Sequence, residues 1–146
     1  MYCRNTMSET MLFSQAFSSD LHESASIQQQ IMDIWLKNGV SDGDLPDLQL
    51  ALEEGLANAV KHGNQLDPAK QVKVECQLLD DCMIRVTIED EGAGFNPEEV
   101  PDPTDFENLD KPSGRGIVLM RAFMDEVLYN DEGNQLTFCK RCSINA

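Results

Sequence analysis

The sequence predicts a two-layer α/β sandwich, in which a mixed, largely antiparallel sheet carries its helices on one face. The first observation is the order of elements along the chain: a strand, two helices, two strands, a long loop, a helix and two strands. The second is that the later strands come in pairs joined by short turns, as antiparallel hairpins do. The third is that strands and helices do not alternate strictly, which argues against a doubly wound dinucleotide-binding fold.

The first half of the chain predicts one strand and two amphipathic helices. Residues 11–17 predict a short strand, and apolar side chains at helical spacing predict a helix over residues 24–38 that Gly39 ends. A second helix is predicted over residues 45–62, with Asp44 as its N-cap. The side chains expected to form its buried stripe are Leu48, Leu52, Leu56, Ala59 and Val60.

The second half predicts two hairpins separated by a loop and a helix. Residues 71–79 and 82–89 alternate apolar and polar side chains on either side of a short turn, which is typical of a hairpin. Residues 96–112 are rich in proline and acidic side chains, and a loop of that length in a compact domain is usually functional or disordered. A helix over residues 116–125 and a closing hairpin around Gly133 complete the domain.

Composition narrows the class of protein. The chain has 146 residues, with 11 basic and 26 acidic side chains, for a formal net charge of -15. Such a charge repels nucleic acid and anionic membranes, so a macromolecular partner is expected to be a protein. The chain has neither a long apolar span nor the apolar centre of a signal peptide. We therefore expect a cytoplasmic protein with a loose tail at residues 1–10 and one domain at residues 11–146.

The five cysteines do not form a recognisable framework. Disulfide-rich domains have denser cysteines in even numbers. Cys139 and Cys142 form a lone Cys-x-x-Cys pair, and the two histidines are not spaced to complete a zinc site with it. We expect the cysteines to be reduced and this pair to be part of a strand.

Three polar motifs stand out, and the first lies on the helix predicted over residues 45–62. Glu54, Asn58 and His62 follow one another at four-residue steps and Gly63 ends the helix, so the three side chains share the face opposite the leucine stripe. A solvated polar face is the ordinary explanation. The small Gly55 beside this row indicates instead that something approaches the helix backbone closely.

The second motif follows the strand predicted over residues 82–89. Asp90 is followed by Gly92 and Gly94, and glycines permit close contact with a ligand. A buried carboxylate there can accept a hydrogen bond from an exocyclic amine, which would select adenine. An ordinary glycine turn is the alternative.

The third motif opens the helix after the long loop. Gly114, Arg115 and Gly116 precede the apolar helix, and backbone N–H groups at a helix N-terminus bind phosphate. The spacing of a Walker loop is absent. Taken alone, this motif is also compatible with a plain glycine-rich entry to a helix.

Together the three motifs, in this order, resemble the GHKL (Bergerat-fold) ATPase superfamily, and within it the small anti-sigma-factor serine/threonine kinases of bacteria. The resemblance covers roughly residues 11–142. It implies ATP and Mg²⁺ as cofactors, with Asn58 holding the metal and Glu54 acting on the acceptor hydroxyl. Glu53, about 100° away on the helix, is the poorer candidate for that role.

The same resemblance assigns the remaining site residues. Asp90 would bind the adenine amino group, in a pocket shaped by Gly92 and Gly94. The residues implied to lie near the phosphates are His62, Gly63, Gly114, Arg115 and Gly116. Residues 96–112 would be the ATP lid. Some family members carry an arginine where Pro112 stands here, so Arg115 or Lys111 is left as the cation for the γ-phosphate.

The implied activity is phosphoryl transfer from ATP to a serine or threonine of a STAS-domain anti-sigma factor antagonist. A sigma factor is a further implied partner, and family members are commonly homodimers. Two alternatives remain: a regulatory module that binds ATP or a partner without transferring phosphate, and the detached catalytic domain of a histidine kinase.

Overall fold

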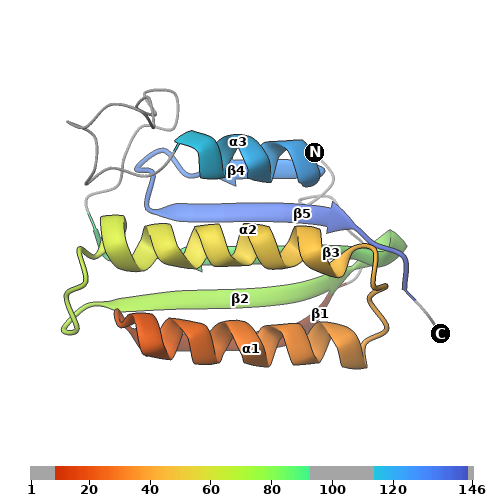
Figure 1. The fold of residues 1–146 in the computed structure, drawn as a ribbon, viewed down its shortest axis with the longest axis horizontal. Helices are drawn as coiled ribbons and strands as arrows, with labels where there is room; N and C mark the ends of the chain where they lie inside the picture. Colours follow the sequence, from red (N-terminus) through yellow and green to blue (C-terminus); the bar gives the residue numbers. More distant parts are fainter. Residues whose placement is uncertain (1–8, 93–113, 145–146) are drawn as a thin grey trace.

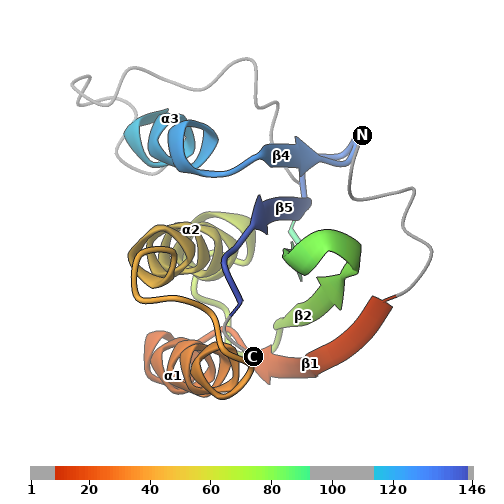
Figure 2. The same cartoon turned by 90° about the vertical axis from the view of Figure 1, so that its right-hand side faces the viewer.

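A five-stranded sheet forms one layer of the molecule and the helices form the other. The computed structural model describes residues 9–92 and 114–144. The strand order is β1-β2-β3-β5-β4, and every pairing among these strands is antiparallel. Figure 1 looks onto the helical layer, and Figure 2 shows the helices on one side of the sheet. The predicted two-layer fold is therefore confirmed.

The elements occur in the predicted order. In chain order they are β1 (Glu9–Ser18), α1 (Leu21–Lys37), α2 (Leu45–Ala57), the π-helical turn η2 (Asn58–Gly63), β2 (Gln71–Leu79), the 3₁₀ turn η3 (Asp80–Cys82), β3 (Met83–Glu89), α3 (Gly114–Phe123), β4 (Glu126–Tyr129) and β5 (Gln135–Arg141). Strand β1 begins two residues before the predicted strand. Gly39 ends α1 with a φ of 85°, a conformation that favours glycine. Within the described ranges, none of the helices is both long and apolar enough to cross a membrane.

The core lies between the helices and the sheet. The predicted stripe of α2 is buried there, together with the alternate apolar side chains of β2 and β3. Trp35 of α1 is fully buried, and its indole Nε1 donates a hydrogen bond to Sγ of Cys76 on β2 (3.1 Å). A large buried aromatic side chain stabilises such a fold by roughly 1.5–3 kcal/mol relative to an exposed one. This packing fixes α1 and α2 against the sheet.

The second predicted helix changes character near its end. The α-helix stops at Ala57, and Asn58–Gly63 continue as a π-helical turn. Hydrogen-bond register within a helix is not encoded in its apolar spacing, so the predicted continuous helix over residues 45–62 is wrong in this detail. Such π-helical turns are frequent at functional sites.

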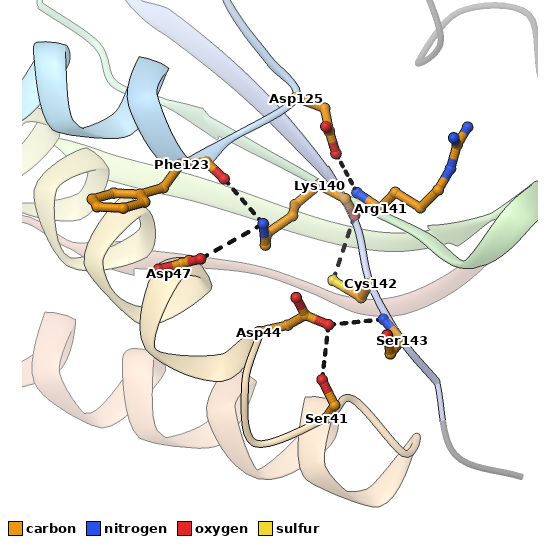
Figure 3. A network of polar contacts seen from close by, with 9 residues as sticks. All are labelled: Ser41, Asp44, Asp47, Phe123, Asp125, Lys140, Arg141, Cys142 and Ser143. Carbon is orange, nitrogen blue, oxygen red and sulfur yellow. Dashed lines mark hydrogen bonds and ion pairs between the residues drawn. The ribbon is translucent and has the colours of Figure 1, made fainter.

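Asp44 is the N-cap residue of α2, as predicted, but its side chain has a different role from the expected one. The Asp44 side chain makes no capping hydrogen bond. Its Oδ2 instead accepts hydrogen bonds from Oγ of Ser41 and from the backbone N–H of Ser143, both at 2.8 Å (Figure 3). The side chain therefore ties the start of α2 to the end of the chain.

Lys140 of β5 extends this connection to α3. Its Nζ donates to the backbone carbonyl of Phe123 (3.1 Å) and pairs with Asp47 in the first turn of α2 (3.6 Å; Figure 3). The first turn of α2 thus lies near the last turn of α3. The end of α2 and the start of α3 both lie at the opposite end of the layer (Figure 1).

The cysteine expectation is corrected for one residue. Cys139 is disulfide-bonded, whereas Cys76, Cys82 and Cys142 are free thiols. Cys139 packs with the small apolar cluster of Leu79 and Met83, and Cys142 belongs to the main core. Cys139 lies in β5 but Cys142 follows its last residue, so only the first member of this Cys-x-x-Cys pair is part of the strand, as expected, and the two side chains pack in different clusters.

Candidate nucleotide site at the end of α2

The row of polar side chains runs along the last turn of α2 into η2. Glu54 is half-buried, whereas the neighbouring Glu53 is exposed to solvent. Asn58 is also half-buried, and its Nδ2 atom is buried with no hydrogen-bond partner among the described residues. A buried amide N–H without a hydrogen-bond acceptor costs free energy of folding, unless a bound molecule supplies the acceptor. His62 lies further along the same segment and is half-buried.

Gly55 does not provide space for a ligand. A Cβ atom at this position would lie 2.7 Å from Cδ1 of Ile88 and 3.0 Å from Cδ2 of Leu136. Ala51, one turn earlier, is likewise buried. The small residues are needed because the sheet packs directly on the helix there. The inference that Gly55 marks close approach is correct, but the approaching group is the sheet.

Gly63, Asp90 and Gly92 form a tight cluster where η2 meets the end of β3. A Cβ atom at Gly63 would overlap the Asp90 carboxyl group, and one at Gly92 would overlap the carbonyl oxygen of Gly63. The Oδ1 atom of Asp90 accepts a hydrogen bond from the backbone N–H of Gly92 (2.8 Å). Neither glycine has a positive φ. Both are needed for space, because the backbone and the carboxylate touch.

Burial controls the electrostatics of Asp90. Loss of solvent raises the pKa of its carboxyl group above the ordinary value, and the negative charge of Glu89 acts in the same direction. The hydrogen bond from Gly92 and the charge of Lys70 oppose this change, without cancelling it. A partly desolvated acceptor at the end of a strand suits a ligand that offers an N–H donor.

Tyr129 at the end of β4 is a residue that the sequence did not single out. Burial raises the pKa of its phenol to about 12; Arg121 opposes that rise, and the carboxylates of Asp90 and Glu54 add to it. Tyr129 is paired with Leu136, whose side chain packs against Gly55. The phenol therefore lies within electrostatic reach of both carboxylates of the candidate site. A strand ending in an aromatic residue was the only sequence signal for it.

The remaining predicted residues are placed less fully. Helix α3 begins at Gly114, so Gly114, Arg115 and Gly116 form its first turn, as predicted. Gly94, Lys111, Pro112 and the predicted lid at residues 96–112 lie outside the described residues. A pocket contains Tyr129 but none of the predicted site residues; its lining is Arg85, Thr87, Leu128, Tyr129, Asn130, Gln135 and Thr137.

The side chains at this end of the fold fit a nucleotide with its metal ion. The unpaired Nδ2 of Asn58 is an N–H donor that suits a phosphate oxygen, the Oδ1 of the same amide is the atom that could hold Mg²⁺, and Asp90 offers an acceptor for an amine. Among the described residues no group of three histidine, cysteine or acidic side chains could hold a metal. Mg²⁺ does not require one, because it usually keeps several waters and takes one or two protein ligands besides phosphate oxygens.

Fold and sequence together define the class of protein. The histidine kinase-like ATPase domain family matches residues 17–140, and the chain belongs to this family, whose GHKL-type nucleotide-binding fold the sequence motifs indicated. A solved structure containing the RsbU and RsbW domains of a Mycobacterium tuberculosis protein covers 92% of the chain and 34% of its own length, with a TM-score of 0.60 at 17% identity. The mycobacterial sensor histidine kinase MprB covers 91% of the chain and 100% of its own length, with a TM-score of 0.52 at 16% identity.

Curated relatives narrow the group further. An anti-sigma F factor of Clostridium perfringens is 36% identical over 97 residues, which are 64% of this chain and 68% of the relative. A second C. perfringens anti-sigma F factor is 35% identical over 104 residues, or 67% of this chain and 73% of the relative. An anti-sigma F factor of a Geobacillus species is 35% identical over 97 residues, covering 64% and 65%. The resemblance to the anti-sigma-factor group is therefore confirmed.

Proposed function

We propose that this chain is an ATP-dependent serine/threonine protein kinase that acts as an anti-sigma factor in a partner-switching system. Its phosphoryl acceptor is a serine or threonine of a STAS-domain anti-sigma factor antagonist. The proposal goes beyond family membership, because it assigns both a reaction and a partner.

One observation carries the catalytic part of the proposal. The buried Nδ2 of Asn58 has no partner in the part of the chain that the structure describes, and Glu54 lies one helical turn before it. A core position would not leave an amide unpaired at this cost. Glu54 and Asn58 are four residues apart and so share one helix face, near the end of the layer at which α3 also begins (Figure 1).

The proposed roles follow from these positions. The Oδ1 of Asn58 would hold Mg²⁺, while its unpaired Nδ2 would donate to a phosphate oxygen of ATP, which supplies the phosphoryl group. Glu54 orients the acceptor hydroxyl and takes its proton as the hydroxyl oxygen attacks the γ-phosphorus of ATP; the bond from that phosphorus to the bridging oxygen breaks, and ADP leaves. Glu53 is exposed on another side of the helix and has no part in transfer.

The other residues bind the nucleotide. Asp90 accepts a hydrogen bond from the adenine amino group, and Gly92 and Gly94 shape the surrounding pocket. The backbone N–H groups of Gly114 and Gly116 in the first turn of α3 bind phosphate oxygens. Arg115 or Lys111 supplies the cation, while His62 and Gly63 support the phosphate end of η2.

The partners are proteins. The net charge of -15 disfavours nucleic acid and anionic membranes. The curated relatives are named anti-sigma F factors, which supports a sigma factor as the second partner. We propose a cytoplasmic homodimer that binds sigma when the antagonist is phosphorylated and releases it when the antagonist is not.

The test is transfer of labelled phosphate. The purified chain is incubated with γ-labelled ATP, Mg²⁺ and a STAS-domain protein encoded beside its gene. The proposal predicts label on a serine or threonine of that protein, and no label when Mg²⁺ is removed by a chelator. Nucleotide binding without any labelled serine or threonine would identify a regulatory ATP-binding module instead. Label on a histidine would identify the catalytic domain of a histidine kinase.

A further inference from the structure

Asn64 is the first residue after η2, and its side chain is fully buried. Its Nδ2 donates hydrogen bonds to Oγ of Ser19 (2.5 Å) and to the carbonyl oxygen of Gln71 (2.9 Å). Its Oδ1 accepts from the backbone N–H of Glu91 (2.8 Å). The amide hydrogen bonds of Asn64 join three segments: the residue after β1, the start of β2 seven residues further on, and the loop after β3.

The backbone around Asn64 is held equally firmly. The N–H of Asn64 donates to the carbonyl of Ala59 (2.9 Å), and the N–H of Leu66 donates to that of Val60 (2.8 Å). Gln65 and Leu66 have φ values of 52° and 59°, in the left-handed region that side chains other than glycine rarely adopt. Such a conformation persists only where the surroundings determine it. Asn64 is the buried anchor of this turn.

The hydrogen bond to Glu91 connects this anchor to the candidate site. Glu91 lies between Asp90 and Gly92, so the N–H that Asn64 holds is the one next to the carboxylate-bearing residue. The following N–H, of Gly92, is held by Asp90 itself. On the other side, Gly63 immediately precedes Asn64, and its backbone touches the Asp90 carboxyl group. Two contacts that start from residues 63 and 64 therefore hold the carboxylate side of Asp90, whereas its backbone is bonded to Asn134.

We propose that Asn64 is a positioning residue that fixes the Asp90 carboxylate against η2 and thereby sets the selectivity of the site for a base bearing an exocyclic amine. This inference rests on the proposed function, in which Asp90 binds that amine. A single hydrogen bond discriminates between bases only if its acceptor is held within a fraction of an ångström of the productive position. Without Asn64, the Glu91 N–H loses its partner next to Gly63, and among the described residues only the bonds of the Asp90 backbone to Asn134 and of the Glu91 side chain to Gln71 remain to hold this part of the loop.

The experiment compares two nucleotides that differ only in this amine: ATP and purine riboside 5′-triphosphate, which lacks it. Affinities for both are measured by calorimetry for the full chain and for Asn64→Leu, which keeps the size of the side chain but cannot form hydrogen bonds. The preference for ATP is expected to fall by at least about tenfold, mainly through weaker binding of ATP. An unchanged preference in this variant overturns the inference.

Ser19→Ala is the matched control. It removes one hydrogen bond of the same Asn64 amide, on the side away from Asp90, and leaves the bond to Glu91. It is expected to lower stability while leaving the preference for ATP unchanged. Equal loss of preference in both variants overturns the inference, because Asn64 would then act only by stabilising the fold.

Two further measurements keep the outcome unambiguous. If the unmodified chain does not prefer ATP, or if Asp90→Asn does not reduce that preference, the proposed role of Asp90 is wrong. If Asp90→Asn reduces the preference for ATP and Asn64→Leu does not, the role of Asp90 stands and only the inference about Asn64 is wrong. Should Asn64→Leu not fold, amide hydrogen exchange of the unmodified chain without nucleotide decides. Protection of the Glu91 N–H is expected, and exchange at the rate of an open loop overturns the inference.

Discussion

Gly63→Ala tests whether the small residue at position 63 is needed for ATP binding, and not only for packing of the core. A Cβ atom at this position would overlap the Asp90 carboxyl group, so the carboxyl group has to move. Gly63 is part of a helical turn without a positive φ, so alanine introduces no backbone strain there. The expected effect of the substitution is therefore a displacement of the Asp90 carboxyl group alone.

The size of the effect follows from the contacts that Asp90 makes. Displacement disrupts its bond to the Gly92 N–H and, in the proposed complex, its bond to the adenine amine. A hydrogen bond to a charged group contributes about 1.5–3 kcal/mol. Since about 1.4 kcal/mol corresponds to tenfold, ATP affinity should fall roughly 10- to 100-fold. The free energy of unfolding changes less, because alanine gains about 1 kcal/mol in helix propensity against an overpacking cost of about 1–3 kcal/mol.

The assay is ATP binding by calorimetry together with urea unfolding, and Gly55→Ala is the control. The same substitution at Gly55 meets the ends of the Ile88 and Leu136 side chains at 2.7 and 3.0 Å, away from Asp90. It should lower the free energy of unfolding by about 1–2 kcal/mol and leave ATP affinity unchanged. If Gly63→Ala binds ATP as tightly as the unmodified chain, the placement of Asp90 in the nucleotide site is refuted.

Three further predictions concern charge, thiols and the far end of the fold. Because the folded-state pKa of Asp90 is raised, its ionisation opposes folding: stability is greatest below the unfolded pKa of about 4 and falls as pH rises through the folded value. Asp90→Asn should therefore raise the urea midpoint of the ligand-free chain at pH 7 but not at pH 3, and an equal shift at both values would argue against this assignment. Alkylation at pH 8 should modify the exposed Cys82 thiol well before the buried Cys76, whose pKa is raised to about 12; equal rates by mass spectrometry would contradict that burial. Lys140→Met should lower the free energy of unfolding by about 1–3 kcal/mol through its lost bonds to α2 and α3, whereas Lys37→Met, at the exposed end of α1, should change it by less than about 0.5 kcal/mol.

Periodicity predicted most of the fold. Alternation over residues 71–79 and 82–89 was enough to place β2 and β3 as a hairpin, and the leucine stripe placed α2 against the sheet. Periodicity reports which face is buried, but not the hydrogen-bond register within a helix. For that reason the π-helical turn Asn58–Gly63 was not predicted.

The candidate site was predicted through its motifs, and the errors lie in their physical explanation. Gly55 was interpreted as a place where a ligand approaches the helix, yet it accommodates the sheet; Gly92, which is proposed to shape the adenine pocket, also accommodates the carbonyl of Gly63. Contacts between segments distant in sequence leave no local pattern. This is why Asn64, which joins three such segments, and Tyr129, which approaches Asp90 from β4, were not predicted.

The central claim is that Glu54 and Asn58 line a phosphoryl-transfer site. The most direct test compares Glu54 with its neighbour Glu53. Single-turnover transfer from Mg²⁺-ATP to the STAS-domain partner is measured for Glu54→Ala and Glu53→Ala, together with ATP affinity. Glu54→Ala should reduce the transfer rate by about 10²–10⁴-fold with ATP affinity nearly unchanged, as for loss of a general base. Glu53→Ala should transfer at the rate of the unmodified chain. Normal transfer by Glu54→Ala, or an equal loss in both variants, would contradict the account.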